Sequence, residues 1–303
     1  MPSTYTDWLA NIQDRANEFV EREQALRGKN STSFHYDVAV GNTVLLAEIG
    51  STMCGVSQSE DTGDVDELGV CIEPPEVALG FHNNEAPLFS LYEFRTKERN
   101  VRSGDGDVDR NIYGLRKFAS LCAKGNPTAI MPLYAPDSFL REVDEFGLEL
   151  RAHRERFLSK RTGHEFLGYL KGQVRRYLDP AISDSSHASR PELVEAHGWD
   201  TKTGYHAVRI AVQGAQLMNQ RSIDLPPMGA QRELFLDIRN GVYTKARVLE
   251  ILRAYTRLLE IATETSDLPD KTDTAQLSVW ISDMYRRYWK ANEETLANYS
   301  SSL

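Results

Sequence analysis

The order of strand-like and helix-like patterns along the chain is the feature that most constrains its fold. Short segments rich in Val, Ile and Leu, bounded by Gly, Asn and Pro, occur at 34–50 and 67–74, as is typical of strands. A third such segment at 107–115 runs into a helical pattern over 113–125, and apolar residues at helical spacing predict an opening helix over 5–26. The front of the chain is therefore predicted to be an α/β unit.

The rest of the chain carries helical patterns only. From about residue 160 onward, the apolar residues recur at the spacing of amphipathic helices over 163–178, 202–219, 244–264 and 274–294. We therefore expect two domains, an α/β domain over 1–150 and an all-helical domain over 151–303.

Charge divides the chain in the same place. Residues 1–150 hold 13 basic and 25 acidic residues, a net charge of −12, whereas the remainder holds 22 basic and 19 acidic ones. The 303 residues are 41% hydrophobic, which excludes a disordered or fibrous chain. No run of 18 apolar residues predicts a membrane helix, and three cysteines without metal-ligand spacing indicate free thiols. We expect a cytoplasmic protein that has no membrane partner.

One short stretch of the front half carries candidate chemistry. Gly50 and Ser51 end an apolar run, and Asp64-Val65-Asp66 follow twelve residues later at the head of the next one. Backbone N–H groups and a hydroxyl at a strand end can hold phosphate oxygens, and alternate strand residues point to one side. Two carboxylates beside a phosphate cradle suit Mg²⁺, although turn residues and a strand-flanking Asp would also explain the pattern.

Several ordered motifs resemble the DNA polymerase β nucleotidyltransferase superfamily. Gly-Ser, a spacer and Asp-x-Asp match its signature, and the segments 107–136, 200–218 and 237–252 are similar to a family of predicted bacterial and phage nucleotidyltransferases, in the same order. Some members are assigned to an RNA-repair-associated branch. Where the family commonly has an aromatic residue after Gly-Ser, this chain has Met53 and Cys54.

The resemblance implies an α+β fold, in which a polymerase β-like catalytic domain with a mixed sheet flanked by helices precedes a helical domain. It implies attack of an acceptor hydroxyl on the α-phosphate of a nucleoside triphosphate, such as ATP, with release of pyrophosphate. Asp64, Asp66 and Asp109 would bind two Mg²⁺ ions, with Mn²⁺ as an alternative, and Asp107 is the alternative third carboxylate. The acceptor is open: an RNA, tRNA or DNA end, or a protein.

Three cations of the helical half are candidate partners of the triphosphate. Lys202, His206 and Arg209 fall at i, i+4 and i+7, so they share one helix face. Lys offers a point charge and Arg a bidentate fork. The resemblance covers this segment and favours phosphate binding over a solvated face. Beside phosphates, His206 is expected to titrate above its usual pKa of about 6.5.

Two other functions remain open. The protein could be a non-catalytic nucleotide-binding or antitoxin-like regulatory module. The presence of both aspartates of Asp-x-Asp speaks against this function. It could also bind nucleic acid, with Lys171, Arg175 and Arg176 as a candidate track, although the acidic balance speaks against tight nonspecific binding.

Overall fold

The computed structural model describes residues 20–21, 23–24, 26, 34–56, 65–80, 91–97, 107–178 and 190–300. Those described between 20 and 26 are helical; the rest of the predicted opening helix lies outside the described residues, as does Asp64.

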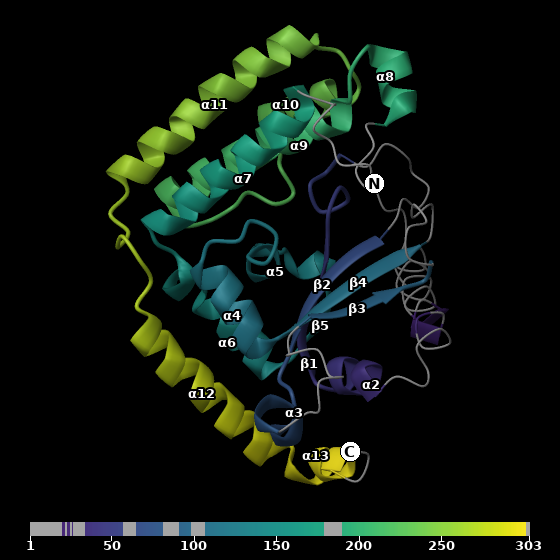
Figure 1. Cartoon of the computed structure of the whole chain (residues 1–303), viewed down its shortest axis with the longest axis vertical. Coiled ribbons are helices and arrows are strands. Elements are labelled where there is room, and N and C mark those ends of the chain that lie inside the picture. The colour runs from purple at the N-terminus through teal and green to yellow at the C-terminus, as the bar shows by residue number, and fades with distance from the viewer. Residues whose placement is uncertain are drawn as a thin grey trace, which may run out of the picture.

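A five-stranded mixed sheet forms the centre of the front half (Figure 1). Its strand order is β3-β4-β2-β1-β5, in which β2 and β4 are parallel and every other pair is antiparallel. The bounds are β1 Thr43–Ile49, β2 Val65–Cys71, β3 Leu91–Arg95, β4 Val108–Gly114 and β5 Leu140–Val143. This sheet, flanked and followed by helices, confirms the predicted α+β class and the strands at 67–74 and 107–115.

The first predicted strand is only half correct, because its front part is the helix α2, Phe34–Gly41. Apolar residues alternate here as in a strand, yet the helix buries Tyr36, Val38 and Ala39 and packs against β3 and β4. The side chains of Asn42 and Thr43 donate to the carbonyls of Val38 and Ala39, both at 2.8 Å, which satisfies carbonyls at the helix end. Burial and capping therefore outweigh the alternating pattern.

The remaining helices include all four predicted from the second half. Around the sheet lie α3 Pro75–Leu79, α4 Leu115–Ala123, α5 Met131–Tyr134, α6 Glu145–Ala152 and the 3₁₀ turns Asp137–Phe139 and Arg154–Phe157. After them come α7 Lys160–Leu178, α8 Pro191–His197, α9 Thr201–Gln220, α10 Gly229–Arg239, α11 Lys245–Thr265, α12 Thr274–Ala291 and α13 Glu293–Ser300.

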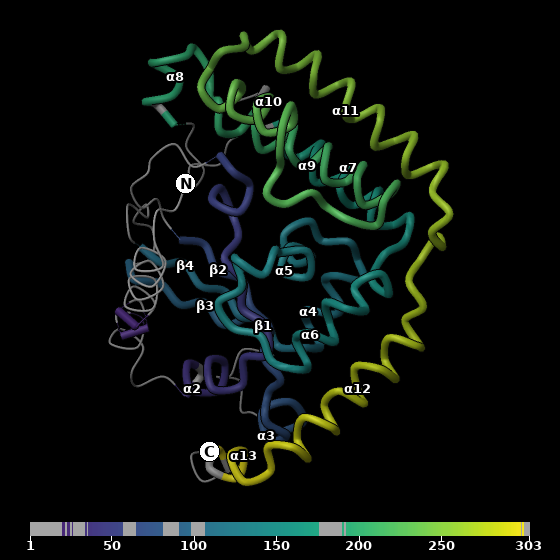
Figure 2. The backbone as a smooth tube through the Cα atoms, turned by 180° about the vertical axis from the view of Figure 1, so that it is seen from behind, coloured from purple at the N-terminus to yellow at the C-terminus, as the bar shows by residue number. Residues whose placement is uncertain are grey.

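Helices α7, α9, α10 and α11 pack together at one end of the molecule, whereas α12 returns along the front half (Figures 1 and 2). In α12, Tyr288 donates to Asn42 Oδ1 at 3.1 Å, and Trp289 donates to the carbonyl of Glu73 at 2.9 Å. In α13, Tyr299 donates to the carbonyl of Asp37 at 3.0 Å. The chain's last helices thus rest on its first elements, and a division at residue 150 stays a prediction.

The two faces of the sheet bury different cores. One face packs Val70 and Ile72 into a large apolar cluster that continues through α4 and α6 into the helices α7, α9 and α11. The other face packs Val65 and Ile112 against α2. Because side chains alternate along a strand, this division also sorts the polar residues of β2 and β4 by face.

Candidate active site

Asp66 and Asp109 lie side by side on the two parallel strands of the sheet. They are register partners near the N-terminal ends of β2 and β4. Neighbouring strands are about 4.8 Å apart, and residues in register point to the same face. The structure therefore brings together two of the three predicted carboxylates, on the face opposite Glu67 and Arg110.

Gly50 follows β1 and lies directly against Asp66. Ile49, the residue before it, is the register partner of Asp66 on the antiparallel side. Gly50 has a φ of +88°, and a Cβ built on it would lie 2.8 Å from Asp66 Oδ2. Both the left-handed backbone and the close approach require glycine, which explains why this residue type precedes the loop.

The loop after Gly50 forms a compact turn over residues 50–56. The N–H of Cys54 donates to the carbonyl of Gly50 at 3.3 Å, and the N–H of Val56 donates to that of Ser51 at 3.1 Å. Within the described part of the chain, no acceptor satisfies the N–H groups of Ser51, Thr52 or Met53. The turn thus offers donors beside the Asp66 carboxylate.

The two candidates for the third carboxylate have different surroundings. Asp107 Oδ1 accepts from Thr96 Oγ1 at 3.1 Å, and its Oδ2 lies 2.5 Å from Lys97 Nζ, so its carboxylate ties β3 to the start of β4. Asp109 Oδ1 lies 3.2 Å from Nε of Arg95, which is its register partner on β3. Arg95 carries a cation into the site that the sequence reasoning missed, because its position depends on the pairing of β3.

The helix α9 reaches the loop through Arg209. Its Nη1 donates to Cys54 Sγ at 2.9 Å, and its Nη2 lies 2.8 Å from Nδ1 of His206, one turn away. Among the described residues, no carboxylate forms an ion pair with Arg209. A partly buried guanidinium without an acidic partner is costly unless an anion joins it. This face of α9 thus points at the predicted phosphate loop.

His206 is neutral near pH 7. Its Nδ1 must accept from Arg209, since a guanidinium can only donate. Burial, followed by the positive charges of Arg209, Lys202 and Arg190, lowers the pKa of His206 to about 3. The sequence predicts that phosphates raise the pKa of His206 above about 6.5. Phosphates would therefore have to raise this pKa from about 3. Lys202 itself is partly buried one turn before His206.

A buried network of ion pairs occupies the opposite face of the sheet. Arg110 Nε lies 2.7 Å from Glu67 Oε2, and Arg110 Nη2 lies 2.5 Å from Glu23 Oε1. Arg141 pairs with Glu48 and has its Nε 3.9 Å from Glu67 Oε1. Sequence reasoning missed these residues, although Glu67 and Arg110 directly follow Asp66 and Asp109. The network links β4, β2, β1 and β5, and so fixes the register that pairs the two aspartates.

Asp66 and Asp109 supply hard oxygen ligands that fit part of a Mg²⁺ shell. Mg²⁺ commonly uses one or two carboxylates together with waters and substrate phosphates. Within the described ranges, no group of three or more His, Cys, Asp or Glu residues could hold a metal. Asp64, which is also predicted to bind the metal, falls outside those ranges.

Among the helices of the described residues, none has the length and hydropathy of a membrane-spanning helix.

Comparison with known proteins gives a distant relative of uncharacterized function. Over 139 residues the chain is 27% identical to an uncharacterized 38.9 kDa protein from the nrdC-mobD intergenic region of Enterobacteria phage T4. The match covers 45% of this chain and 38% of that protein, so it spans well under half the length of the relative.

The chain is also similar to a solved structure and to a protein family. The nucleotidyltransferase-like protein from Exiguobacterium sibiricum 255-15 aligns with a TM-score of 0.27 and 11% identity, over 78% of this chain and 73% of that chain. The RNA repair pathway DNA polymerase beta family matches residues 10–283, which is most of the sequence. The chain therefore belongs to the RNA repair pathway DNA polymerase beta family.

Proposed function

We propose that the protein transfers a nucleoside monophosphate from a nucleoside triphosphate to an acceptor hydroxyl, with release of pyrophosphate. The observation that carries this proposal is the adjacency of Asp66 and Asp109 beside the Gly50 turn. Two carboxylates next to N–H donors that have no acceptor among the described residues combine sites for a divalent cation and for phosphate oxygens. Most of the catalysis in such a site comes from positioning and charge stabilisation.

Each carboxylate has a proposed role. Asp66 and Asp109, with Asp64, would hold Mg²⁺, which when bound neutralises phosphate charge and polarises the reacting oxygens. Asp109 would also orient the acceptor hydroxyl and accept its proton, as a general base must lie within hydrogen-bond reach. The ion pair with Arg95 keeps this carboxylate compensated when no ligand is present.

The loop and α9 would bind the triphosphate from two sides. The N–H groups that follow Gly50 and the hydroxyl of Ser51 would donate to its oxygens. Arg209 would exchange the sulfur of Cys54 for a phosphate, which is the stronger acceptor for a guanidinium. His206 and Lys202 would add further cationic character, because a phosphate beside them stabilises the protonated imidazole.

Asp109→Asn separates the two candidate third carboxylates. We expect this variant to keep nucleotide binding within a few-fold of the parent while lowering turnover about 100-fold or more, since it removes a group needed in the transition state. Turnover is measured as pyrophosphate release in the presence of pooled cellular RNA, DNA and protein, and binding by calorimetry.

Asp107→Asn is the matched control two residues earlier on the same face. It should loosen the contacts with Thr96 and Lys97 and leave turnover close to that of the parent. If Asp107→Asn lowers turnover and Asp109→Asn does not, the role belongs to Asp107.

A further inference from the structure

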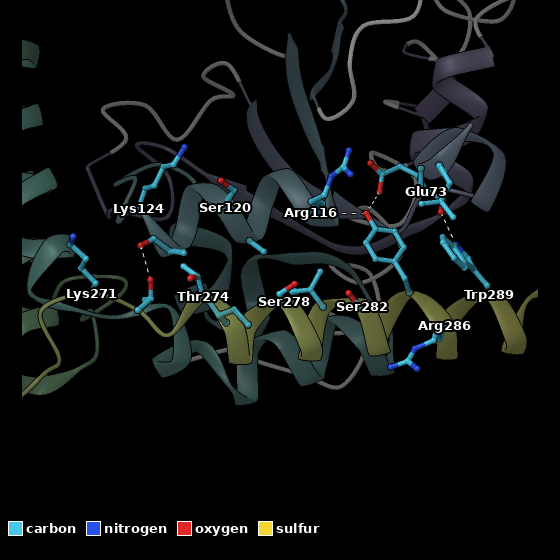
Figure 3. A pocket seen from close by; sticks show the side chains of 18 of the residues that line it. Glu73, Arg116, Ser120, Lys124, Lys271, Thr274, Ser278, Ser282, Arg286 and Trp289 are labelled. Atoms are coloured by element: carbon cyan, nitrogen blue, oxygen red, sulfur yellow. Dashed lines mark hydrogen bonds between the residues drawn. The ribbon is translucent and has the colours of Figure 1, made fainter. Parts of the chain in front are cut away.

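A groove of about 660 Å³ lies between α4 and α12 (Figure 3). Asp66 and Asp109 are the second residues of β2 and β4, whereas Glu73 and Arg116, which line the groove, follow the ends of these strands. A seven-residue strand is about 23 Å long, so the sheet separates the two places. The groove is therefore a second candidate site.

Small residues on α4 leave space between the two helices along the groove. Ala119, Ser120 and Ala123 face Leu277 and Ile281 of α12 across it, giving an apolar floor. The end of α4 is tied to the start of α12, where Thr272 Oγ1 donates to the carbonyl of Ala123 at 3.3 Å. This hydrogen bond fixes the spacing of the two helices at this end of the groove.

Hydroxyl and aromatic side chains follow α12 in two stripes. Thr274, Ser278 and Ser282 recur every fourth residue, and so lie in one row of the helix. A neighbouring row carries the aromatic residues Tyr285 and Trp289, whose rings are 5.3 Å apart with a tilt of 52°. Polar donors and aromatic surface are thus arranged along a line of about 22 Å, at 1.5 Å per residue.

The aromatic end is held in place by Glu73. Tyr285 donates to Glu73 Oε2 at 2.6 Å, and Trp289 Nε1 donates to the carbonyl of Glu73 at 2.9 Å. Burial raises the pKa of the Glu73 carboxyl, which the hydrogen bond from Tyr285 partly offsets. The polar atoms of both rings are therefore already used, and the rings can contribute apolar surface to a ligand.

The groove carries a strong excess of positive charge. Its basic lining residues are Arg116, Lys124, Arg161, Lys271 and Arg286, while among the described residues that line it only Glu73 is acidic. Two of these cations are paired outside the lining, Arg161 with Glu165 and Arg286 with Asp283. Lys124 and Lys271 lie at the end opposite Glu73 and Trp289 (Figure 3), and in the described part of the chain neither forms an ion pair with a carboxylate. Such a concentration in a chain of net charge −9 indicates an anionic ligand.

We propose that this groove binds a segment of single-stranded nucleic acid. Cations at both ends match a ligand that repeats its negative charge, and Tyr285 with Trp289 offers the aromatic surface on which bases stack. An acidic peptide would use the cations but not the rings. This site is separate from the proposed transferase site, and binding there does not require transfer.

Fluorescence anisotropy with a labelled 12-nucleotide single-stranded RNA tests the proposal. The parent should bind it with an affinity that falls as salt rises, and Lys124→Gln with Lys271→Gln should reduce the slope of log K against log salt by about 1.4, or 0.7 per lost phosphate contact. Ser278→Trp, at an exposed position, should fill the groove and weaken binding at least about tenfold, through lost contacts rather than lost charge.

Lys290→Gln is the matched control, because Lys290 is an exposed cation of α12 that does not line the groove. Equal binding by the parent, the double variant and Ser278→Trp would overturn the proposal. So would equally tight binding of a polyglutamate peptide, which would show that charge alone is recognised. Asp66→Asn should leave RNA binding unchanged and Ser278→Trp should leave triphosphate binding unchanged, so that either site can fail without the other.

Discussion

Asp66→Asn is expected to weaken Mg²⁺-dependent binding of a nucleoside triphosphate by about 100-fold. Asp66 is the carboxylate that touches the Gly50 turn and lies in register with Asp109, so its loss removes a proposed ligand at the centre of the site. Losing even an outer partner of a metal commonly costs 10-fold to 100-fold in affinity. Calorimetry with each triphosphate, with Mg²⁺ and with chelator, measures the effect.

The thermal stability of this variant distinguishes a lost ligand from a damaged fold. Removing one of two neighbouring negative charges relieves repulsion, so the midpoint of unfolding should stay the same or rise. Asp137→Asn, whose side chain is 90% exposed, is the control and should bind as the parent does. Undiminished Mg²⁺-dependent binding by Asp66→Asn would remove this residue from the site.

Arg110→Ala is expected to lower the free energy of unfolding by about 3–5 kcal/mol, because it leaves the buried carboxylate of Glu67 without its nearest cation. This is a large share of the roughly 5–15 kcal/mol that stabilises a typical domain. Urea denaturation followed by circular dichroism measures the change. Since the network fixes the β2–β4 register, triphosphate binding should weaken as well.

Two further variants test the cause of this loss. Arg110→Met combined with Glu67→Leu removes both buried charges and should recover much of the stability, as buried pairs can often be replaced by apolar residues. Arg257→Ala breaks an exposed pair with Glu260 and should cost under about 1 kcal/mol. If Arg110→Ala lowers the free energy of unfolding by no more than Arg257→Ala does, the buried network does not stabilise the fold.

Local patterns predicted much of this fold because they report burial directly. The helical spacing of α7, α9, α11 and α12 and the apolar run of β2 follow from which faces are covered. Alternation over α2 was misleading, since a short buried helix and a strand can share an apolar pattern. The strands β3 and β5, of five and four residues, depend on pairing partners that no local pattern names.

The candidate site likewise combines residues that the sequence predicts with contacts that only the fold shows. Residue spacing and the family resemblance pointed to Gly50, Asp66 and Asp109, and the register of β2 with β4 explains why the two carboxylates share a face. Spacing could not show that Arg95 pairs with Asp109, or that Arg209 reaches Cys54 from a helix 155 positions later. Those contacts depend on strand register and on the packing of α9 against the loop, which are properties of the whole fold.

Transfer of label from triphosphates carrying ³²P at the α-phosphate to pooled cellular RNA, DNA and protein is the most direct test of the proposed activity. We expect Mg²⁺-dependent labelling of one class of acceptor, with release of pyrophosphate, by the parent and not by Asp66→Asn. Mg²⁺-dependent triphosphate binding without label transfer to any class of acceptor would contradict it and favour a non-catalytic nucleotide-binding module.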